Sequence, residues 1–292
     1  MRLFWSWPKP IEVNDETDAR RVIATILSEG NADDWRRLDI AALAPIVDEL
    51  PLFGGASKMW SALCKEAADM RSRRDLVLDD GQRRVLRAAA QVLPELGFEL
   101  AGGTALAAAY LGHRRSEDLD FFSLGGPVRD AVRAFVKACE QDNLPVKRSD
   151  KDEQPSFTRL WVAGVKVEVG RDSPFRLAKS RTVIEGMPVR SLRDLAADKT
   201  LALFGRAATR DFVDVYMLQS RYGLDRLMEL AKQKDPGFSR DWFAKALQQV
   251  ERADPADVAM LSPLDFDRMK TDFLRDAQRL VQAEVDLDDP DI

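Results

Sequence analysis

The sequence predicts an α+β protein with a small mixed sheet, a helical domain before it and a helical bundle after it. Two observations predict this class. Short alternating segments and helical periodicities mix between residues 95 and 190, whereas the segments before residue 76 and after residue 190 carry helical periodicity alone. We therefore expect an N-terminal helical domain over 1–75, an α+β core over 76–190 and a C-terminal helical domain over 191–292.

The N-terminal domain is expected to contain three helices with a small core of their own. Apolar residues recur at helical spacing within 22–27, 38–50 and 59–64. Asn14 or Asp15 is placed to cap the first helix, and Pro51 ends the second. A polar stretch from Arg71 to Asp80 is expected to link this domain to the core.

The core is expected to combine strands and helices. Strands are predicted at 98–101, 119–123 and 183–190, and two alternating runs within 156–170 indicate a hairpin joined at Ala163–Gly164. Helices are predicted at 82–93, 104–111 and 127–141, with Pro127 in the first turn of the last. Further helices are predicted over the C-terminal domain, at 191–205, 209–221, 224–233, 239–252 and 264–284.

Charge restricts the possible partners. The chain has 44 basic and 49 acidic residues and a net charge of −5, so it does not bind nucleic acid through bulk charge. An RNA substrate would need a local basic patch, for which Arg71–Arg74 and Arg114–Arg115 are candidates. A solvated helix end is the preferred interpretation of Arg71–Arg74.

Composition restricts the compartment. No run approaches ~18 apolar residues, so no membrane span is expected. The start, MRLFWSWPKP, lacks the pattern of a signal peptide, so we expect a cytoplasmic protein. In that compartment Cys64 and Cys139 are expected to be reduced core residues. A single histidine, His113, makes a structural zinc site unexpected.

The stretch Ala101 to Ser123, AGGTALAAAYLGHRRSEDLDFFS, carries the chemistry. Gly102 and Gly103 stand between a predicted strand and a predicted helix, where backbone without a Cβ can approach a ligand closely. The N-terminus of the following helix favours phosphate, and Thr104 could cap that helix and touch a phosphate oxygen. A tight turn without a ligand is the alternative for the glycine pair alone.

Three acidic residues point to a divalent cation. Asp118 and Asp120 flank Leu119, and side chains two apart on a strand share one face, where carboxylates repel unless a cation lies between them. Glu168 lies on one face of a later strand, beside Lys166. Hard oxygen ligands of this kind suit Mg²⁺ (or Mn²⁺), and three carboxylates can hold two metals. A solvated strand end is the alternative for the Asp pair, and an exposed strand face is the alternative for Glu168.

These segments resemble a known family. A glycine pair, then an Asp-x-Asp about a dozen residues later and a third acid on a later strand, resembles the polymerase-β-like nucleotidyltransferases. More narrowly, GGTALAAAYLGHRRSEDLDFFS resembles the AbiEii/AbiGii toxins of type IV toxin–antitoxin systems. Ser191 to Leu218 agrees, through Lys199, Arg206, Arg210, and the step from Asp211 to Asp214. The resemblance covers roughly residues 82 to 230 and leaves out the first 75.

The resemblance implies roles for individual residues. The nucleotide-binding set is Gly102, Gly103, Thr104, His113, Arg114, Ser116 and Lys199. The catalytic set is Asp118, Asp120, Glu168, Lys199 and Asp211, of which Asp118, Asp120 and Glu168 would bind the metal. Lys199 would contact the triphosphate, and Asp211, rather than Asp214, would lie near Lys199 and orient it. Arg114 would make paired contacts to phosphate.

Plain structural roles are the alternatives for several of these residues. His113 could be a loop histidine, Lys199 a surface lysine and Asp211 a helix cap. Phosphate on Ser116, which the family suggests as regulation, would block the metal site by charge. Asp194 and Asp198 are expected on solvated helix faces. The Phe121–Phe122 pair is expected to pack rather than to stack on a base.

The resemblance implies an enzyme that transfers NMP from an NTP to an RNA, with tRNA favoured, or to a protein, as a toxin with a cognate antitoxin. A protein that binds an NTP such as GTP without transfer is the alternative, and an interaction module that has lost catalysis is another. Residues 1–75 faintly resemble short helical proteins encoded beside such enzymes. They are either a regulatory module or, as we prefer, an extension that packs on the core.

Overall fold

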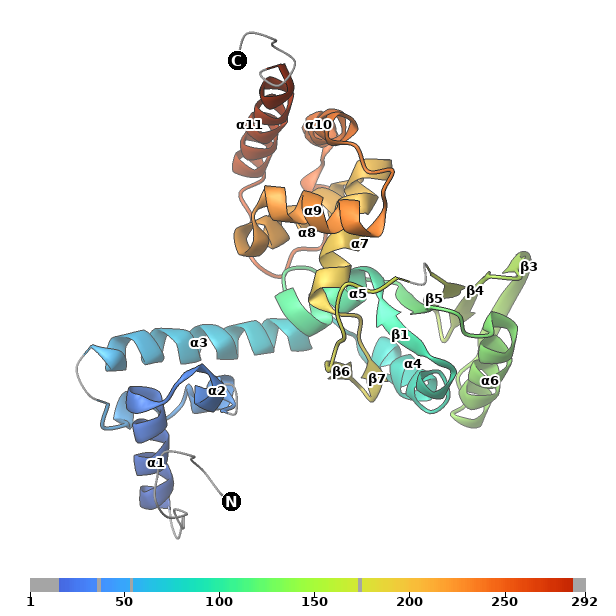
Figure 1. The fold of residues 1–292 in the computed structure, drawn as a ribbon. Helices are drawn as coiled ribbons and strands as arrows, with labels where there is room; N and C mark the ends of the chain where they lie inside the picture. The colour runs from blue at the N-terminus through green and yellow to red at the C-terminus, as the bar shows by residue number, and fades with distance from the viewer. Residues whose placement is uncertain (1–15, 36–37, 53–54, 173–174, 286–292) are drawn as a thin grey trace. The chain divides into compact units, whose positions relative to one another are not determined.

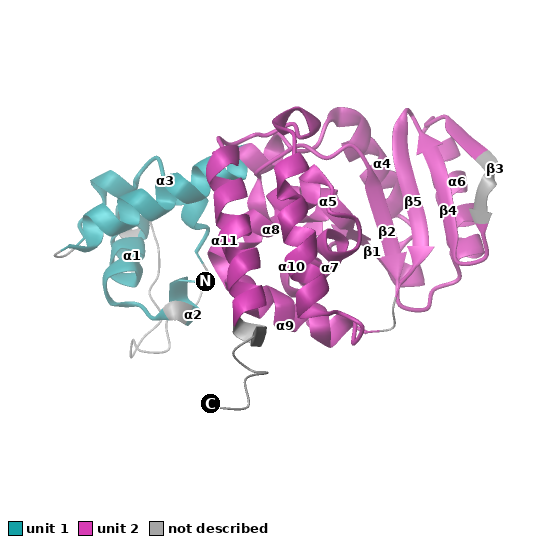
Figure 2. Cartoon of the chain, turned by 90° about the horizontal axis from the view of Figure 1, so that it is seen from above, with its two compact units in different colours: residues 1–72 teal, residues 73–292 magenta. Residues whose placement is uncertain are grey.

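The computed structural model describes residues 16–35, 38–52, 55–172 and 175–285. The chain forms two compact units, residues 1–72 and 73–292 (Figure 2). The predicted α+β core and the C-terminal helices therefore both belong to the second unit. The proposed caps Asn14 and Asp15 lie outside the described residues.

The first unit contains a small helical core. Its helices are α1 (Glu16–Glu29), α2 (Ala32–Trp35), the 3₁₀ turns η1 (Ile40–Leu43) and η2 (Val47–Glu49), and α3 (Ala56–Asp75). Trp60 is buried, its ring meets Trp35 edge-on at 5.3 Å, and its indole N–H donates to the carbonyl of Leu27 at 2.7 Å. Val47 and Cys64 complete this core.

Two predictions for this part of the chain were wrong. The segment 38–50 forms two 3₁₀ turns rather than one helix, and Asp39 caps the first of them by accepting a hydrogen bond from the backbone of Ala42. The stretch predicted as a linker from Arg71 continues α3 as far as Asp75. Local capping by a short polar side chain competes with a continuous helix.

The second unit is built on a five-stranded mixed sheet (Figure 1). Its order is β1 (Phe98–Ala101), β2 (Leu119–Ser123), β5 (Val165–Arg171), β4 (Phe157–Val162) and β3 (Val146–Gln154). Only β2 and β5 pair in parallel among these strands. The predicted hairpin turn is confirmed, since Ala163 and Gly164 have φ of 50° and 87°, as a tight two-residue turn requires.

Two strands differ from the prediction. The predicted strand 183–190 is a small hairpin, β6 (Val183–Ile184) and β7 (Met187–Pro188), because Glu185 and Gly186 both adopt positive φ. The edge strand β3 was missed, because six of the nine residues in its sequence, VKRSDKDEQ, are charged. Charged residues are typical of sheet edges, where they discourage pairing with another chain.

Helices cover one face of the sheet and leave the other for the site. α6 (Val128–Gln141) packs against β4 and β5, and α4 (Asp80–Ala90) packs against β5 and α6 (Figure 1). The short helix α5 (Gly102–Leu106) follows β1 directly and continues as the π-helical turn η4 (Ala107–Leu111). Phe135 of α6 meets Phe121 of β2 edge-on at 5.9 Å, which confirms that Phe121 packs in the core.

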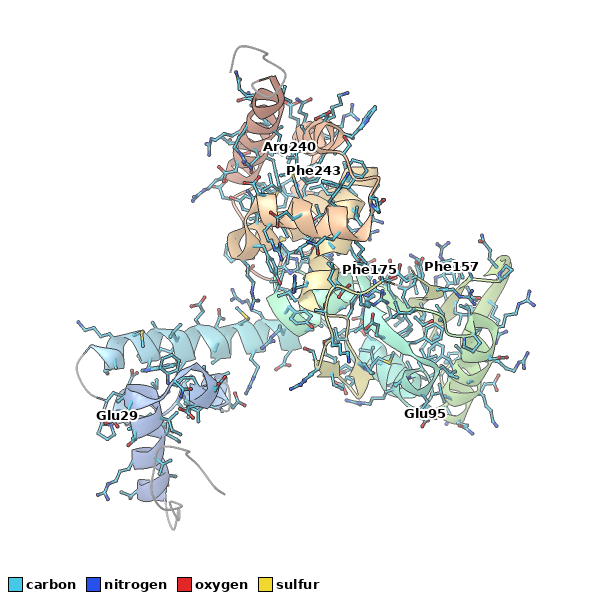
Figure 3. The ribbon with its side chains drawn as sticks, viewed as in Figure 1. Glu29, Glu95, Phe157, Phe175, Arg240 and Phe243 are labelled. Atoms are coloured by element: carbon cyan, nitrogen blue, oxygen red, sulfur yellow. The ribbon has the colours of Figure 1, made fainter. Side chains whose placement is uncertain are left out.

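The C-terminal part is a helical bundle. It consists of α7 (Leu192–Arg206), α8 (Thr209–Tyr222), α9 (Leu224–Lys234), α10 (Arg240–Gln248) and α11 (Phe266–Val285), with the 3₁₀ turns η5 (Gln249–Arg252) and η6 (Pro255–Asp257). Another 3₁₀ turn, η3 (Pro94–Leu96), precedes β1. Phe243 lies buried inside the bundle (Figure 3). α7 also contacts α5, so the bundle meets the sheet beside the glycine pair.

Candidate active site

A cavity of about 450 Å³ lies between the uncovered face of the sheet and α7. The sheet side carries three acids and two cations, and the helical side carries three cations and one acid. The lining residues are Gly102, Gly103, Arg114, Ser116, Asp118, Asp120, Phe122, Arg159, Lys166, Glu168, Asp198, Lys199, Ala202, Arg206 and Arg210. Its volume is in the range of small-ligand pockets.

The three predicted carboxylates line this cavity together. Asp120 of β2 pairs in register with Glu168 of β5, and Asp118 stands two residues before Asp120. Leu119 and Phe121 alternate with them and are fully buried on the other face. The strand register therefore brings together two acids from adjacent strands and a third from the residue just before β2.

Asp120 is the most confined of the three. Burial, and then the neighbouring charge of Glu168, raise the pKa of its carboxyl to about 6. A Cβ placed on Gly102 would lie 1.7 Å from Asp120 Oδ2, and Gly102 has φ of +68°. Only glycine therefore allows the loop after β1 to pass beside this carboxylate.

Two cations on the sheet compensate the acids. Lys166 Nζ lies 3.0 Å from Asp118 Oδ2 and 3.1 Å from Glu168 Oε1. Arg159 of β4, which pairs in register with Glu168, donates to it at 2.9 and 3.0 Å. Partial burial opposes the charged form of Lys166, but its hydrogen bonds to Asp118 and Glu168 raise its pKa.

Gly103 faces the cavity, but Thr104 does not. A Cβ on Gly103 would lie 2.6 Å from Arg114 Nη2 and 3.1 Å from Ser116 Oγ, so this position is also restricted to glycine. Thr104 is fully buried, and its hydroxyl donates to the backbone carbonyl of Asp118. The prediction that Thr104 caps the helix was wrong, because α5 begins at Gly102, and the Thr104 hydroxyl instead holds the loop before β2.

Asp214 of α8 is the centre of the cationic wall. It is fully buried and accepts from Lys199 Nζ at 2.7 Å, and from Arg114 Nε and Nη2 at 2.7 and 2.8 Å. His113 Nε2 lies 2.8 Å from the same carboxylate. Burial alone would raise the pKa of Asp214, but Lys199, Arg114 and His113 together hold it well below its usual range.

Three predicted roles change as a result. His113 is fully buried against Asp214 and does not line the cavity, so its ring is used within the protein in this structure; burial lowers its pKa and favours the neutral ring. Arg114 reaches the cavity, but its paired donors are committed to Asp214 rather than to phosphate. Asp214, not Asp211, orients Lys199.

Asp211 has a different partner. It is fully buried and receives both Nε and Nη2 of Arg206, at 2.6 and 2.8 Å. Arg206 ends α7 and lines the cavity, with half of its side chain exposed. The carboxylate of Asp211 therefore positions an arginine at the cavity rather than the lysine.

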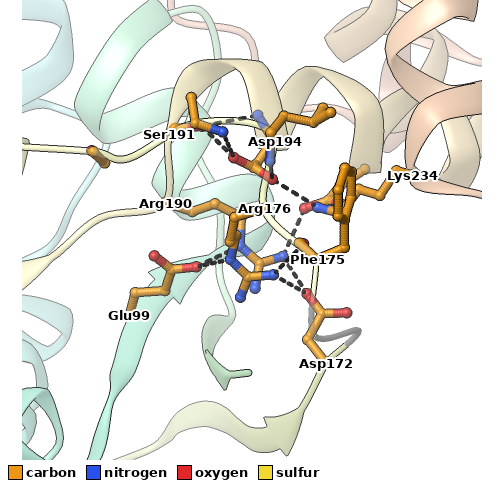
Figure 4. Close-up of polar contacts among 12 residues, drawn as sticks. Glu99, Asp172, Phe175, Arg176, Arg190, Ser191, Asp194 and Lys234 are labelled. Carbon is orange, nitrogen blue, oxygen red and sulfur yellow. Dashed lines mark hydrogen bonds and ion pairs between the residues drawn. The ribbon is translucent and has the colours of Figure 1, made fainter. Parts of the chain in front are cut away.

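A second polar network fixes the start of α7 (Figure 4). Asp194 is fully buried and accepts from the backbone N–H groups of Leu177 and Ala178 and from the Ser191 hydroxyl. Asp198, one turn later, pairs with Arg190 at 2.7 Å and with Lys234 at 2.5 Å. The prediction that Asp194 and Asp198 lie on solvated faces was wrong, because both acids tie α7 to its surroundings.

Comparison with known proteins identifies the family. The profile described as nucleotidyl transferase AbiEii toxin, type IV toxin–antitoxin system, matches residues 84–288. The chain belongs to the AbiEii family. It is therefore a nucleotidyltransferase of a toxin family, and such a family implies an antitoxin partner.

Individual proteins that resemble this AbiEii-family protein share less than a third of their aligned residues with it. An uncharacterised protein of Aquifex aeolicus is 29% identical over 159 residues, which are 53% of this chain and 75% of that protein. Among solved structures, JHP933 from Helicobacter pylori has a TM-score of 0.41 and 20% identity, over 75% of this chain and 93% of that one. MenT4, a nucleotidyltransferase toxin of Mycobacterium tuberculosis, has a TM-score of 0.42 and 17% identity, over 73% and 92%.

The site of this AbiEii-family enzyme contains residues that sequence reasoning missed. Arg159 was not considered, although its strand alternates, and Lys166 was noted only as a neighbour of Glu168. The alternation in Val165–Val169 already placed Lys166 and Glu168 on one face. Asp211 and Asp214 are three residues apart on one helix, so spacing alone could not say which of them faces α7.

The donor chemistry of the sheet face fits a hard divalent cation. Asp118, Asp120 and Glu168 offer carboxylate oxygens, the ligands that Mg²⁺ and Mn²⁺ prefer. Within the described ranges, no three acidic, histidine or cysteine side chains converge as a ready cage. In this structure the charged ammonium of Lys166 lies between the carboxylates of Asp118 and Glu168.

Among the described residues, no helix combines the length and the apolar composition that a membrane crossing requires. The two cysteines, Cys64 and Cys139, are buried thiols.

Proposed function

We propose that this AbiEii-family enzyme is metal-dependent and transfers NMP from an NTP to an RNA, with tRNA as the first acceptor to test and a protein as the second. The observation that carries the proposal is one cavity with an acidic wall of three carboxylates on the sheet side and a basic wall of Lys199, Arg206 and Arg210 on α7 and α8. A substrate with an anionic triphosphate and a bound cation matches both walls. We further propose a cytoplasmic location and a cognate antitoxin.

The acidic wall would hold the metal. Asp118, Asp120 and Glu168 are the proposed ligands of Mg²⁺ or Mn²⁺. When bound, the metal would supply charge neutralisation to the phosphates and activation of the attacking hydroxyl. Gly102 and Gly103 keep the loop clear of Asp120 and of Ser116, so the carboxylate face stays open to the cavity.

The basic wall would hold the triphosphate. Lys199 and Arg206 line the cavity and are each oriented by a buried carboxylate, Asp214 and Asp211 respectively. Arg210 adds a third cation on the same wall. Cations that are fixed before the reaction offset charge that develops on a leaving pyrophosphate without further rearrangement.

The proposed transfer is a nucleophilic displacement at the α-phosphorus of the NTP. The acceptor hydroxyl oxygen forms a bond to the α-phosphorus of the NTP, and the bond between the α-phosphorus and the bridging oxygen breaks. Pyrophosphate leaves with the electrons of that bond, and the hydroxyl proton passes to a carboxylate of the acidic wall.

Labelled nucleotides test the proposal. Each α-³²P NTP is incubated with the protein, Mg²⁺ and total RNA, and label in RNA and in protein is measured. We expect incorporation from one or more NTPs, and a fall of at least about a thousandfold in Asp118→Ala and Asp120→Ala, since each removes a metal ligand. Incorporation that survives in both variants contradicts the proposed ligands.

Binding without transfer is the second candidate. The contacts of Lys166 favour it, because they neutralise two carboxylates without a metal. In that case an NTP such as GTP binds in a filter or calorimetric assay, but no label becomes covalent in any acceptor.

A further inference from the structure

Lys166 lies among the carboxylates that the proposed function assigns to a metal ion. Its ammonium is within 3.1 Å of oxygens from Asp118 and from Glu168. We infer that Lys166 is a resident cation that closes the metal site in the nucleotide-free protein and gives way when metal and triphosphate enter together. The inference rests on the proposed metal-dependent function and adds a control of metal loading to it.

The backbone register brings Lys166 near these acids. The ladder between β2 and β5 begins with Leu119 paired to Val167, so Asp118 and Lys166 are the residues that directly precede the first pair on the two strands. Side chains on facing positions of paired strands are neighbours. The ammonium therefore reaches both carboxylates as a direct consequence of strand pairing.

The charges of this face explain why a resident cation is required. Three carboxylates share the face, and without compensation they would repel one another. Arg159 approaches Glu168 from β4, on the opposite side of β5 from β2. Lys166 is the cation that joins the Asp118 side of the face to the Glu168 side.

An ammonium and a divalent ion compete for these oxygens. A metal bound at about 2 Å from either oxygen would lie close to the ammonium, and the two positive charges repel. Lys166 has a flexible stem, and a third of its side chain is exposed in the cavity, so its ammonium can leave the carboxylates. The triphosphate of a bound NTP provides new partners for the ammonium in the same cavity.

Titration with Mn²⁺ tests this directly, with free Mn²⁺ followed by electron paramagnetic resonance in the absence of nucleotide. The variants are Lys166→Met, Lys166→Gln as a second form of the same change, Lys147→Met as the matched control, and Asp118→Asn, which removes a proposed ligand. Lys147 lies exposed on β3 and does not line the cavity, so its replacement changes net charge equally. Circular dichroism confirms that each variant is folded.

We expect Lys166→Met and Lys166→Gln to bind Mn²⁺ about tenfold more tightly than wild type or Lys147→Met, because a competing charge is removed. Adding the four α,β-methylene NTPs is expected to strengthen Mn²⁺ binding more in wild type than in Lys166→Met. Equal affinity in all forms, with binding lost in Asp118→Asn, overturns the role of Lys166 alone. No Mn²⁺ binding by any form, with or without nucleotide, overturns the metal-dependent function as well.

Discussion

The basic and acidic walls of the cavity differ in how their carboxylates are compensated by cations. On the helical wall, each buried acid is matched by cations, as with Asp214 between Lys199 and Arg114, and Asp211 with Arg206. On the sheet wall, three acids share Lys166 and Arg159, and the pKa of Asp120 rises to about 6. The acids of the helical wall are therefore fully paired with cations, whereas the sheet wall carries an excess of negative charge.

The difference in charge pairing indicates that the two walls respond differently to a ligand. The helical wall can hold its shape before any ligand arrives, because its charges are paired and buried. The sheet wall is relieved only by an added proton or cation. Unequal sensitivity of the two walls to mutation and to pH is therefore expected, and three experiments measure it.

The largest effect is expected at Asp214. Asp214→Asn leaves Lys199 and Arg114 buried without a counter-charge, and should lower the free energy of unfolding by about 3–5 kcal/mol. Asp211→Asn is the matched comparison, because Arg206 is half exposed and can turn to solvent. Its expected cost is about 1–3 kcal/mol.

Urea unfolding of both variants measures this difference, and nucleotide binding is measured in parallel under folding conditions. Equal losses of stability would contradict the view that Asp214 is the centre of the wall. If Asp211→Asn retains stability but weakens nucleotide binding, Arg206 is a positioned ligand as proposed.

The second effect is a pH dependence at Asp120 in protein treated with chelator. Its carboxyl has a pKa near 6 when folded and 3.8 as the reference value, so the folded state binds the proton more tightly. Stability from this group is greatest at low pH and falls as pH rises from about 4 to 6, by up to roughly 3 kcal/mol. Asp120→Asn removes this term and should be more stable than wild type at pH 7.

The advantage of Asp120→Asn over wild type should shrink towards zero near pH 4. Glu95→Gln is the control, because this exposed glutamate (Figure 3) carries the same change of charge away from the cavity. A constant difference between Asp120→Asn and wild type across this pH range would show that the sheet wall has no excess charge.

The smallest effect on stability is expected at two glycines with positive φ, Gly102 beside the site and Gly164 in the hairpin turn. Gly102→Ala and Gly164→Ala both place a Cβ at positive φ, so Gly164→Ala should cost about 1–2 kcal/mol in the free energy of unfolding and Gly102→Ala at least as much. Only Gly102→Ala also collides with Asp120, because nothing lies within 4 Å of a Cβ at Gly164. We expect a loss of transfer activity of about a hundredfold or more for Gly102→Ala alone.

Stability and transfer are compared for the two alanine variants at one temperature. Equal activity in both would mean that Asp120 can move without consequence, and would weaken its proposed role as a ligand.

Most helices of the second unit and the strands beside the site were predictable because their signals are local. Strands at 98–101 and 119–123 and the turn at Ala163–Gly164 follow from alternation and turn residues, and they are confirmed. The charged edge strand β3 and the 3₁₀ turns of the first unit were not predictable. Pairing and capping partners determine those elements, rather than a periodic pattern.

The sequence by itself determined the acids at 118, 120 and 168, the glycine pair and the family resemblance, because each lies in a short segment with a regular spacing. Only the tertiary structure decided which partners they meet. In the folded chain Thr104 and His113 are buried. Lys199 pairs with Asp214, and Arg206 pairs with Asp211. Lys166 lies between two carboxylates. Spacing gives the face on which a side chain lies, whereas register and helix packing choose the charge that lies opposite it.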